Sequence, residues 1–301
     1  MVALNIGRQS STACSGSHNG SSYTKLRACY VSRIKMPISP DNTAGLCSQA
    51  VDKRIRIPNS LGEALVGVLD TSGSSDIVVL CHGFRSSKES STLTSIASRL
   101  VETGFSPFRF DFSGNGESDG EFQYGNYWKE VDDLRSVICF LTAQGNKVRA
   151  IVGHSKGGNV VLLYASKFSD ISTVVNLSGR FNLQAGIKER LGEDVLKLIE
   201  EQGYLEIKDK DDNTEYTVTL KDLRERMNTD MKSAVLAIPE NIRILTVRGT
   251  EDKIVNVSDA KEFDQFIPNH KLHILDGANH GFTLHREELQ QLVTDFIQED
   301  M

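Results

Sequence analysis

The chain has 301 residues, enough for one large α/β domain or two small ones, and a chain of this length can fold without disulfides or metals. Its net charge of -6 argues against a nucleic-acid-binding protein, and no apolar run approaches the ~20 residues that cross a bilayer. The five cysteines are scattered and form no Cys-x-x-Cys motif, which favours a reducing compartment with no structural disulfide or zinc.

Residues 1–50 are expected to form a disordered tail ahead of a folded domain that spans 51–301. The first forty residues hold eight serines, five of the 34 basic side chains and none of the 40 acidic ones. This composition is typical of an organelle transit peptide, so we expect a plastid protein. A disordered tail on a cytoplasmic protein, or translation from Met36, would also fit. Without those forty residues the chain has a net charge of -11.

After the tail, short apolar runs alternate with helical periodicity, which predicts a mostly parallel sheet covered by helices on both faces. The turn at residues 59–62 predicts an antiparallel hairpin at one edge of this sheet. Pro107 is expected to bend its strand or to confine it to an edge. The predicted strands cover residues 54–57, 64–69, 77–81, 105–111, 148–152, 174–177, 242–247 and 272–275. The predicted helices are centred on residues 93–100, 128–141, 159–168 and 289–296.

One segment interrupts this alternation. Residues 180–239 separate two predicted core strands and are too long for a simple connection. They contain a predicted helix at 194–202, two short strands at 204–207 and 216–220, and the start of another helix near 223–227. We expect this insertion to cover the carboxyl edge of the sheet as a cap, because ligands of α/β proteins bind at that edge. A surface excursion far from any site is the alternative.

Ser155 lies in the sequence Gly153-His154-Ser155-Lys156-Gly157, between a predicted buried strand and a predicted helix. This is the Gly-x-Ser-x-Gly nucleophile elbow in the context that it requires. The turn is so tight that its flanking positions must be nearly without side chains, and Gly153 and Gly157 meet that need. Ser155 is therefore predicted to be a nucleophile.

A serine hydroxyl needs a base, and the imidazole of that base needs a carboxylate. His280 follows the last predicted strand, among small residues; His270 and His273 lie in or beside a strand, and His285 begins the last helix.

Asp252 lies just beyond the strand 242–247, which gives the chain order Ser, Asp, His. Glu251 is its main competitor, and Asp276 is very near the histidine in the sequence. We predict His280 as the base and Asp252 as the acid.

The oxyanion of a tetrahedral intermediate needs backbone donors. One is expected to be the N–H of Lys156, directly after the nucleophile. The other is expected to be the N–H of Phe84, in the loop His82-Gly83-Phe84 that follows the strand 77–81. His82 is expected to brace this loop rather than to act as a base.

Together with residues 110–118, which read Phe-Asp-Phe-Ser-Gly-Asn-Gly-Glu-Ser, these motifs resemble the α/β-hydrolase superfamily. The similarity spans about residues 55–296 and is greatest to small serine esterases, including cinnamoyl and feruloyl esterases, to monoacylglycerol lipases and to the S33 aminopeptidase-like group. It implies the α/β-hydrolase fold and the catalytic and oxyanion roles above. Two positions depart from the pattern: Lys156 replaces the usual Gln or Met, and Asn115 stands where a His is usual.

The expected function is a serine carboxylesterase that cleaves a small or lipid-like ester through an acyl-enzyme, with no metal or organic cofactor. A thioesterase or an aminopeptidase would use the same residues. A small-molecule receptor on this fold, with little or no turnover, is the alternative from another class. We expect a small-molecule substrate as the partner, and neither nucleic acid nor an integral membrane segment; the oligomeric state stays open.

Overall fold

The computed structural model describes residues 53–299. The predicted tail and its interpretation as a transit peptide lie outside the described residues. Among the helices of the described part, none is long and apolar enough to cross a membrane.

Eight strands form one sheet in the order β1-β2-β4-β3-β5-β6-β9-β10. The pairs β1–β2 and β2–β4 are antiparallel, and every pair from β4 to β10 is parallel. The predicted mostly parallel sheet with a hairpin at one edge is confirmed. The strands are β1 (Lys53–Pro58), β2 (Ala64–Leu69), β3 (Asp76–Cys81), β4 (Ser106–Phe110), β5 (Lys147–His154), β6 (Thr173–Leu177), β9 (Arg243–Gly249) and β10 (His270–Leu275).

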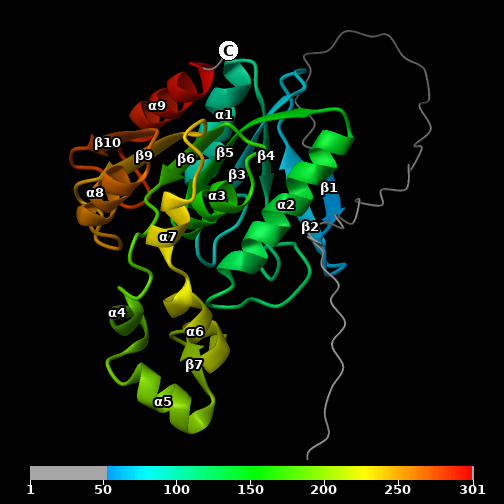
Figure 1. Cartoon of the computed structure of the whole chain (residues 1–301). Helices are drawn as coiled ribbons and strands as arrows, with labels where there is room; N and C mark the ends of the chain where they lie inside the picture. The colour runs from blue at the N-terminus through cyan, green and yellow to red at the C-terminus, as the bar shows by residue number, and fades with distance from the viewer. Residues whose placement is uncertain (1–52, 300–301) are drawn as a thin grey trace, which may run out of the picture. The chain divides into compact units, whose positions relative to one another are not determined.

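Helices cover both faces of this sheet (Figure 1). Successive side chains of a strand point to opposite faces, so Val79 of β3 belongs to one apolar core and Val78 and Leu80 to the other. The first core is closed by α2 (Tyr127–Ala143), α3 (Lys156–Lys167), α7 (Met231–Leu236) and α8 (Val257–Phe266). The second is closed by α1 (Ser91–Glu102) and α9 (Arg286–Gln298). Helix α8 was not among the predicted helices.

The strand that contains Pro107 is not an edge strand, which corrects that part of the expectation. β4 lies between β2 and β3. Its pairing with β2 extends only from Phe110 to Phe108, so Pro107 is the first residue beyond that register. The carbonyl of Pro107 still accepts the N–H of Asp70 at 3.0 Å, but Pro107 has no N–H to return the second bond of such a pair, so the β2–β4 ladder ends there.

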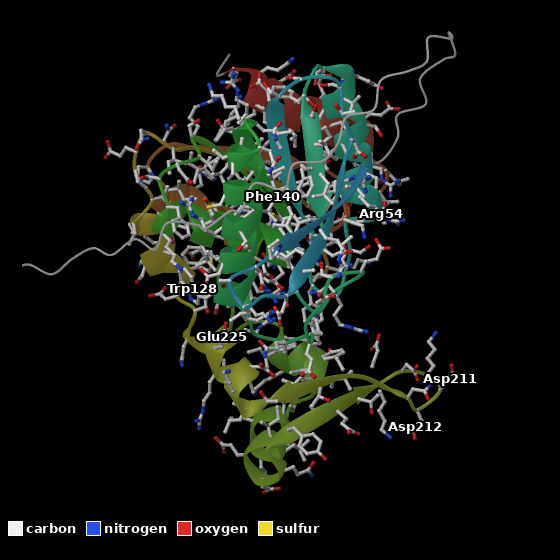
Figure 2. All side chains as sticks on the ribbon, turned by 90° about the vertical axis from the view of Figure 1, so that its right-hand side faces the viewer. Arg54, Trp128, Phe140, Asp211, Asp212 and Glu225 are labelled. Carbon is white, nitrogen blue, oxygen red and sulfur yellow. The ribbon has the colours of Figure 1, made fainter. Side chains whose placement is uncertain are left out.

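The inserted segment folds around an apolar core of its own, and its elements lie together below the sheet in Figure 1. Tyr124 joins this core from the loop before α2, and Phe84 packs against it from the loop after β3. Asp211 and Asp212 lie at the outer tip of the hairpin (Figure 2). The elements are α4 (Ile187–Leu191), α5 (Val195–Gln202), β7 (Tyr204–Lys208), β8 (Thr214–Thr219) and α6 (Leu220–Asn228). Helix α7 instead packs in the core of the sheet, so the separate unit ends near residue 228.

Two loops at the carboxyl edge of the sheet are joined by buried polar groups. His82, after β3, donates from Nδ1 to the carbonyl of Gly83 at 2.8 Å and accepts the N–H of Phe112 at Nε2, at 3.1 Å. Asp111, after β4, accepts the ammonium of Lys88 at 2.6 Å and the backbone N–H of the same residue at 2.7 Å. Both members of this ion pair are almost completely buried. These bonds fix the loop that carries Phe84 against the end of β4.

The substitution Asp111→Ala is expected to lower the free energy of unfolding by about 3–5 kcal/mol, because it leaves the buried ammonium of Lys88 with Glu117 alone. Urea unfolding measures this. As a control, Arg56→Ala removes an ion pair to Asp119 whose side chains are more than half exposed, and we expect a change within about 1 kcal/mol. Similar losses in the two variants would contradict this interpretation.

Burial lowers the pKa of His82 to about 4. Between about pH 6.5 and pH 4 the unfolded chain therefore binds a proton at His82 that the native protein does not bind. The free energy of unfolding should fall as the pH falls through this range. In His82→Gln the slope should be smaller by up to one proton, about 1.4 kcal/mol per pH unit, with parallel curves above pH 7. Urea unfolding at a series of pH values measures both slopes. Equal slopes in the wild-type protein and in His82→Gln would disprove the lowered pKa of His82.

Candidate active site

Ser155 lies at the sharp turn between β5 and α3. Its backbone has φ 55° and ψ -118°, a left-handed conformation that is strained for a residue with a side chain. A Cβ on Gly153 would lie 2.1 Å from the carbonyl oxygen of Gly157, and one on Gly157 would lie 2.5 Å from that of Cys81. Only glycine fits either position. The N–H of Ser155 donates to the carbonyl of Leu177 at 2.7 Å, which ties the turn to β6.

A chain of hydrogen bonds connects Ser155, His280 and Asp252. Nε2 of His280 lies 3.0 Å from Oγ of Ser155, and its Nδ1 lies 2.8 Å from Oδ2 of Asp252. Because Nδ1–H donates to the carboxylate, Nε2 is the free acceptor for the serine hydroxyl. The three side chains come from the loops after β5, β9 and β10, which meet at the carboxyl edge of the parallel strands.

The surroundings of Asp252 keep its carboxylate charged. Its side chain is fully buried, and it accepts the N–H groups of Ile254 and Val255 at 2.9 Å each and the guanidinium of Arg248 at 3.0 Å. Burial alone would raise the pKa of Asp252, but the hydrogen bond and charge of His280 and the two N–H groups lower it below its ordinary value.

The two competing acids lie elsewhere. Glu251 is exposed, and Asp276 is exposed and accepts the hydroxyl of Thr250 at 3.0 Å. Of the other histidines near the last strand, His270 bonds to Asp264 and to Thr246. The structure thus brings His280 to Asp252 and to neither Glu251 nor Asp276.

Two further residues support this arrangement, and the sequence analysis did not identify them. Nε2–H of His154 donates to the carbonyl of His280 at 2.8 Å, and burial lowers the pKa of His154 to about 4, so the ring is neutral near pH 7. Arg248 is fully buried and bonds both to Asp252 and to the carbonyl of Gly179. A charged residue at the end of an otherwise apolar strand is a signal that could have pointed to Arg248.

The two predicted oxyanion donors lie beside Ser155. A Cβ on Gly83 would lie 3.0 Å from Cβ of Ser155, so the loop that continues to Phe84 passes directly over Ser155. Lys156 is the first residue of α3, and the first N–H groups of a helix have no partner within the helix. Phe84, Ser155 and Lys156 line one small cavity of about 40 Å³.

The ammonium of Lys156 forms a buried ion pair. It donates to Glu130 at 2.8 Å and to the side-chain oxygen of Asn126, and it lies 5.0 Å from the ring of Tyr127. Both members of the pair with Glu130 are at least 95 % buried. The ammonium of this unusual lysine, directly after Ser155 in the chain, is therefore neutralised by a carboxylate on α2.

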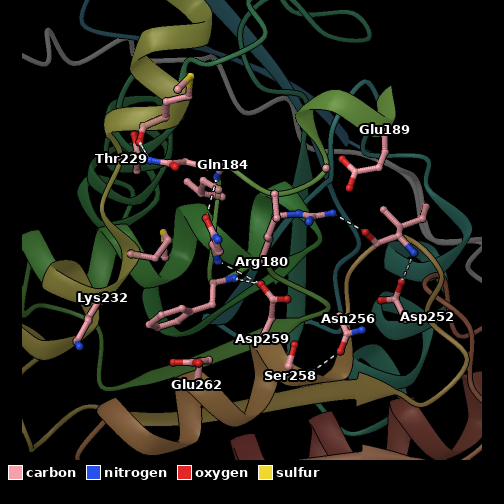
Figure 3. Close-up of a pocket in the computed structure, with 18 of the residues that line it drawn as sticks. Arg180, Gln184, Glu189, Thr229, Lys232, Asp252, Asn256, Ser258, Asp259 and Glu262 are labelled. Carbon is pink, nitrogen blue, oxygen red and sulfur yellow. Dashed lines mark hydrogen bonds between the residues drawn. The ribbon is translucent and has the colours of Figure 1, made fainter. Parts of the chain in front are cut away.

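A larger pocket of about 900 Å³ adjoins the small cavity (Figure 3). Arg180, Gly186 and Ile254 line both spaces. In Figure 3 the side chain of Arg180 extends across the larger pocket, away from Asp259 and toward the side on which Asp252 lies. A substrate that reaches Ser155 could therefore occupy both spaces, with Arg180 at their boundary.

Comparisons with known proteins agree with this architecture. Est1E from Butyrivibrio proteoclasticus, in its structure with bound ferulic acid, is 23% identical with a TM-score of 0.69, and the match covers 81% of this chain and 98% of Est1E. The esterase Pf2001 of Pyrococcus furiosus is 21% identical with a TM-score of 0.65, covering 86% of this chain and 96% of that protein. A putative uncharacterized protein of Saccharomyces cerevisiae is 24% identical over 231 residues, 68% of each chain.

A family model described as serine aminopeptidase, S33, matches residues 73–288. This range contains Ser155, Asp252 and His280 together with the inserted segment. The chain belongs to this S33 family of the α/β-hydrolase superfamily, and it is a hydrolase by that membership.

Proposed function

We propose that this protein hydrolyses a carboxylic ester through an acyl-enzyme on Ser155. The observation that carries the proposal is the continuous hydrogen-bond chain from Oγ of Ser155 through His280 to the buried carboxylate of Asp252. It supplies a nucleophile, a base with a free acceptor nitrogen, and a negative charge beside the imidazolium that forms. The esterase neighbours support an ester as the bond that is cleaved.

In the first step, Oγ of Ser155 attacks the ester carbonyl and its proton passes to Nε2 of His280. The oxyanion that forms accepts the N–H groups of Phe84 and Lys156. His280 then gives the proton to the leaving alcohol as the C–O bond breaks, which leaves an acyl ester on Ser155. In the second step, His280 takes a proton from water, whose oxygen attacks the acyl group; the acid leaves and Ser155 regains its proton.

An aminopeptidase is the second candidate, and the description of the family model favours it. The larger pocket also contains carboxylates that could hold a free amine: Glu189, Asp230, Asp259 and Glu262. The small cavity beside Ser155, by contrast, is lined by arginines and by no carboxylate of the described residues. A free ammonium close to the scissile bond would be repelled there, so we rank the ester above the peptide.

A fluorophosphonate probe is expected to label the full-length protein, and p-nitrophenyl esters of several chain lengths are expected to be hydrolysed. Ser155→Ala should abolish labelling and lower kcat by about 10⁴-fold or more, because the nucleophile is gone. Ser166→Ala, near the other end of the same helix, is the matched control and should retain both. A protein that is labelled slowly and turns over no ester would be the receptor alternative.

The identity of the acid can be tested separately. Asp252→Asn should lower kcat/KM by about 10³- to 10⁴-fold, because an amide can hold the imidazole in the wrong tautomer and leaves its charged form without a counter-ion. Glu251→Gln, an exposed neighbour, should change kcat/KM by less than about threefold. A larger loss in Glu251→Gln than in Asp252→Asn would overturn this assignment.

A further inference from the structure

The small cavity that contains Ser155 is lined by basic residues although the chain has a net charge of -6. Among residues 53–299 its lining includes Lys156, Arg180, Arg190 and Arg226, and no Asp or Glu. The ammonium of Lys156 is neutralised by Glu130, as described above. The three guanidinium groups form no ion pair of this kind with any carboxylate in residues 53–299.

Each arginine is held by groups other than carboxylates. The guanidinium of Arg180 donates to the carbonyl of Ile254. Nε of Arg226 donates to the carbonyl of Leu183 at 2.9 Å, and a terminal nitrogen donates to the carbonyl of Ala185 at 3.1 Å.

The guanidinium of Arg190 lies 4.4 Å from the ring centre of Phe84. Within residues 53–299, none of the three arginines forms an ion pair with a carboxylate. Since a guanidinium carries five N–H donors, several remain available to a ligand.

The positive charges of these arginines oppose one another. Arg226 is 7% exposed, and burial together with the charge of Arg226 lowers the pKa of Arg180. Asp259 acts in the opposite direction, but its carboxylate is already bound to the N–H groups of Phe181 and Asn182. A ligand with a negative charge would relieve this repulsion.

A second, independent feature of the cavity points to a ligand. Ser178 is fully buried and lines the cavity, and its Oγ has no hydrogen-bond partner within the described part of the chain. Buried hydroxyl groups are nearly always bonded, so an isolated one at a cavity wall is a position that a ligand can satisfy. The hydroxyl can donate to an anionic oxygen beside the arginines.

We propose that the substrate ester carries a short anionic group, a carboxylate or a phosphate, which binds Arg180 and Arg226 in the cavity beside Ser155. This inference rests on the proposed esterase function and defines its substrate class. The cavity volume of about 40 Å³ limits the bound part to a small group, and the larger pocket beyond Arg180 can take the rest of the molecule. The anion can belong to the acid or to the alcohol part of the ester, and matched substrates distinguish these two sources.

The test compares full-length enzyme on two pairs of esters. The first pair is p-nitrophenyl hydrogen glutarate and p-nitrophenyl valerate, which place an anion or a methyl group at the end of the acyl chain. The second pair is 4-acetoxybenzoate and 4-methylphenyl acetate, which place a carboxylate or a methyl group on the alcohol part of the ester. Background rates are taken from Ser155→Ala. We expect kcat/KM to be about tenfold or more higher for the anionic member of one pair.

Arg180→Gln should reduce this preference about tenfold to a hundredfold, and Arg180→Lys, which retains the charge, should restore part of it. Arg224→Gln, an exposed arginine on the same inserted segment, is the matched control and should leave the preference unchanged. A preference near one in both pairs, or one that Arg180→Gln does not alter, would overturn the inference while neutral-ester turnover and probe labelling still support the esterase.

A binding measurement separates the anion-site proposal from the esterase proposal if the protein hydrolyses none of these esters. Glutarate should raise the Tm of Ser155→Ala, and the shift should be lost when Arg180→Gln is added. A shift in a protein that hydrolyses no ester and takes no fluorophosphonate label would support the anion site and contradict the esterase. Absence of any shift, labelling and turnover would contradict both.

Discussion

The tight turn at Ser155 is the constraint on which the rest of the site depends. A residue with a side chain is held at φ 55°, and such a conformation persists only where its surroundings over-determine it. Gly153 and Gly157 allow the backbones of β5, α3 and the loop after β3 to approach within contact distance. The bond from Ser155 to β6 and the bond from His154 to the carbonyl of His280 then hold the turn from both sides. Ser155 and His280 are thus held in one hydrogen-bonded arrangement at the carboxyl edge of the sheet.

Most of the sheet could be predicted from the sequence because a strand buried on both faces is a continuous apolar run, and residues such as Ile77 and Val152 leave little alternative. The Gly-x-Ser-x-Gly motif located Ser155 for a similar reason, since local geometry dictates its glycines. Helix α8 was missed because only a few of its residues are buried, so its apolar periodicity is weak. The strand with Pro107 was misjudged because Pro107 lies where the pairing with β2 ends, so its missing N–H ends that ladder without interrupting it, and the sequence does not show where the pairing ends.

The candidate site also contains residues that the sequence predicts and residues that it does not. Ser155, Asp252 and His280 follow predicted strands, and the topology of a parallel sheet brings such loops together. Arg248 and His154 act through hydrogen bonds to those residues. Arg248 has only a weak signal, a charge at the end of a largely apolar strand, and nothing in the local sequence distinguishes His154 from an exposed histidine. The clustering of positive charge is even harder to predict from the sequence. The arginines that line the cavity come from three separate places in the inserted segment, within a chain that is acidic as a whole.

The buried pair of Lys156 and Glu130 has a consequence for how this sequence can vary. Replacing Lys156 alone with an uncharged residue would leave the buried carboxylate of Glu130 without its counter-ion beside α3. Replacing both members with apolar residues of similar volume can leave the free energy of unfolding nearly unchanged. The two positions lie on different helices, α3 and α2, yet a substitution at either one alone is expected to lower the stability of the fold. Homologues of this chain should therefore vary at these two positions together, and the pair would mark a subgroup whose members inherited the lysine and its counter-charge as one unit.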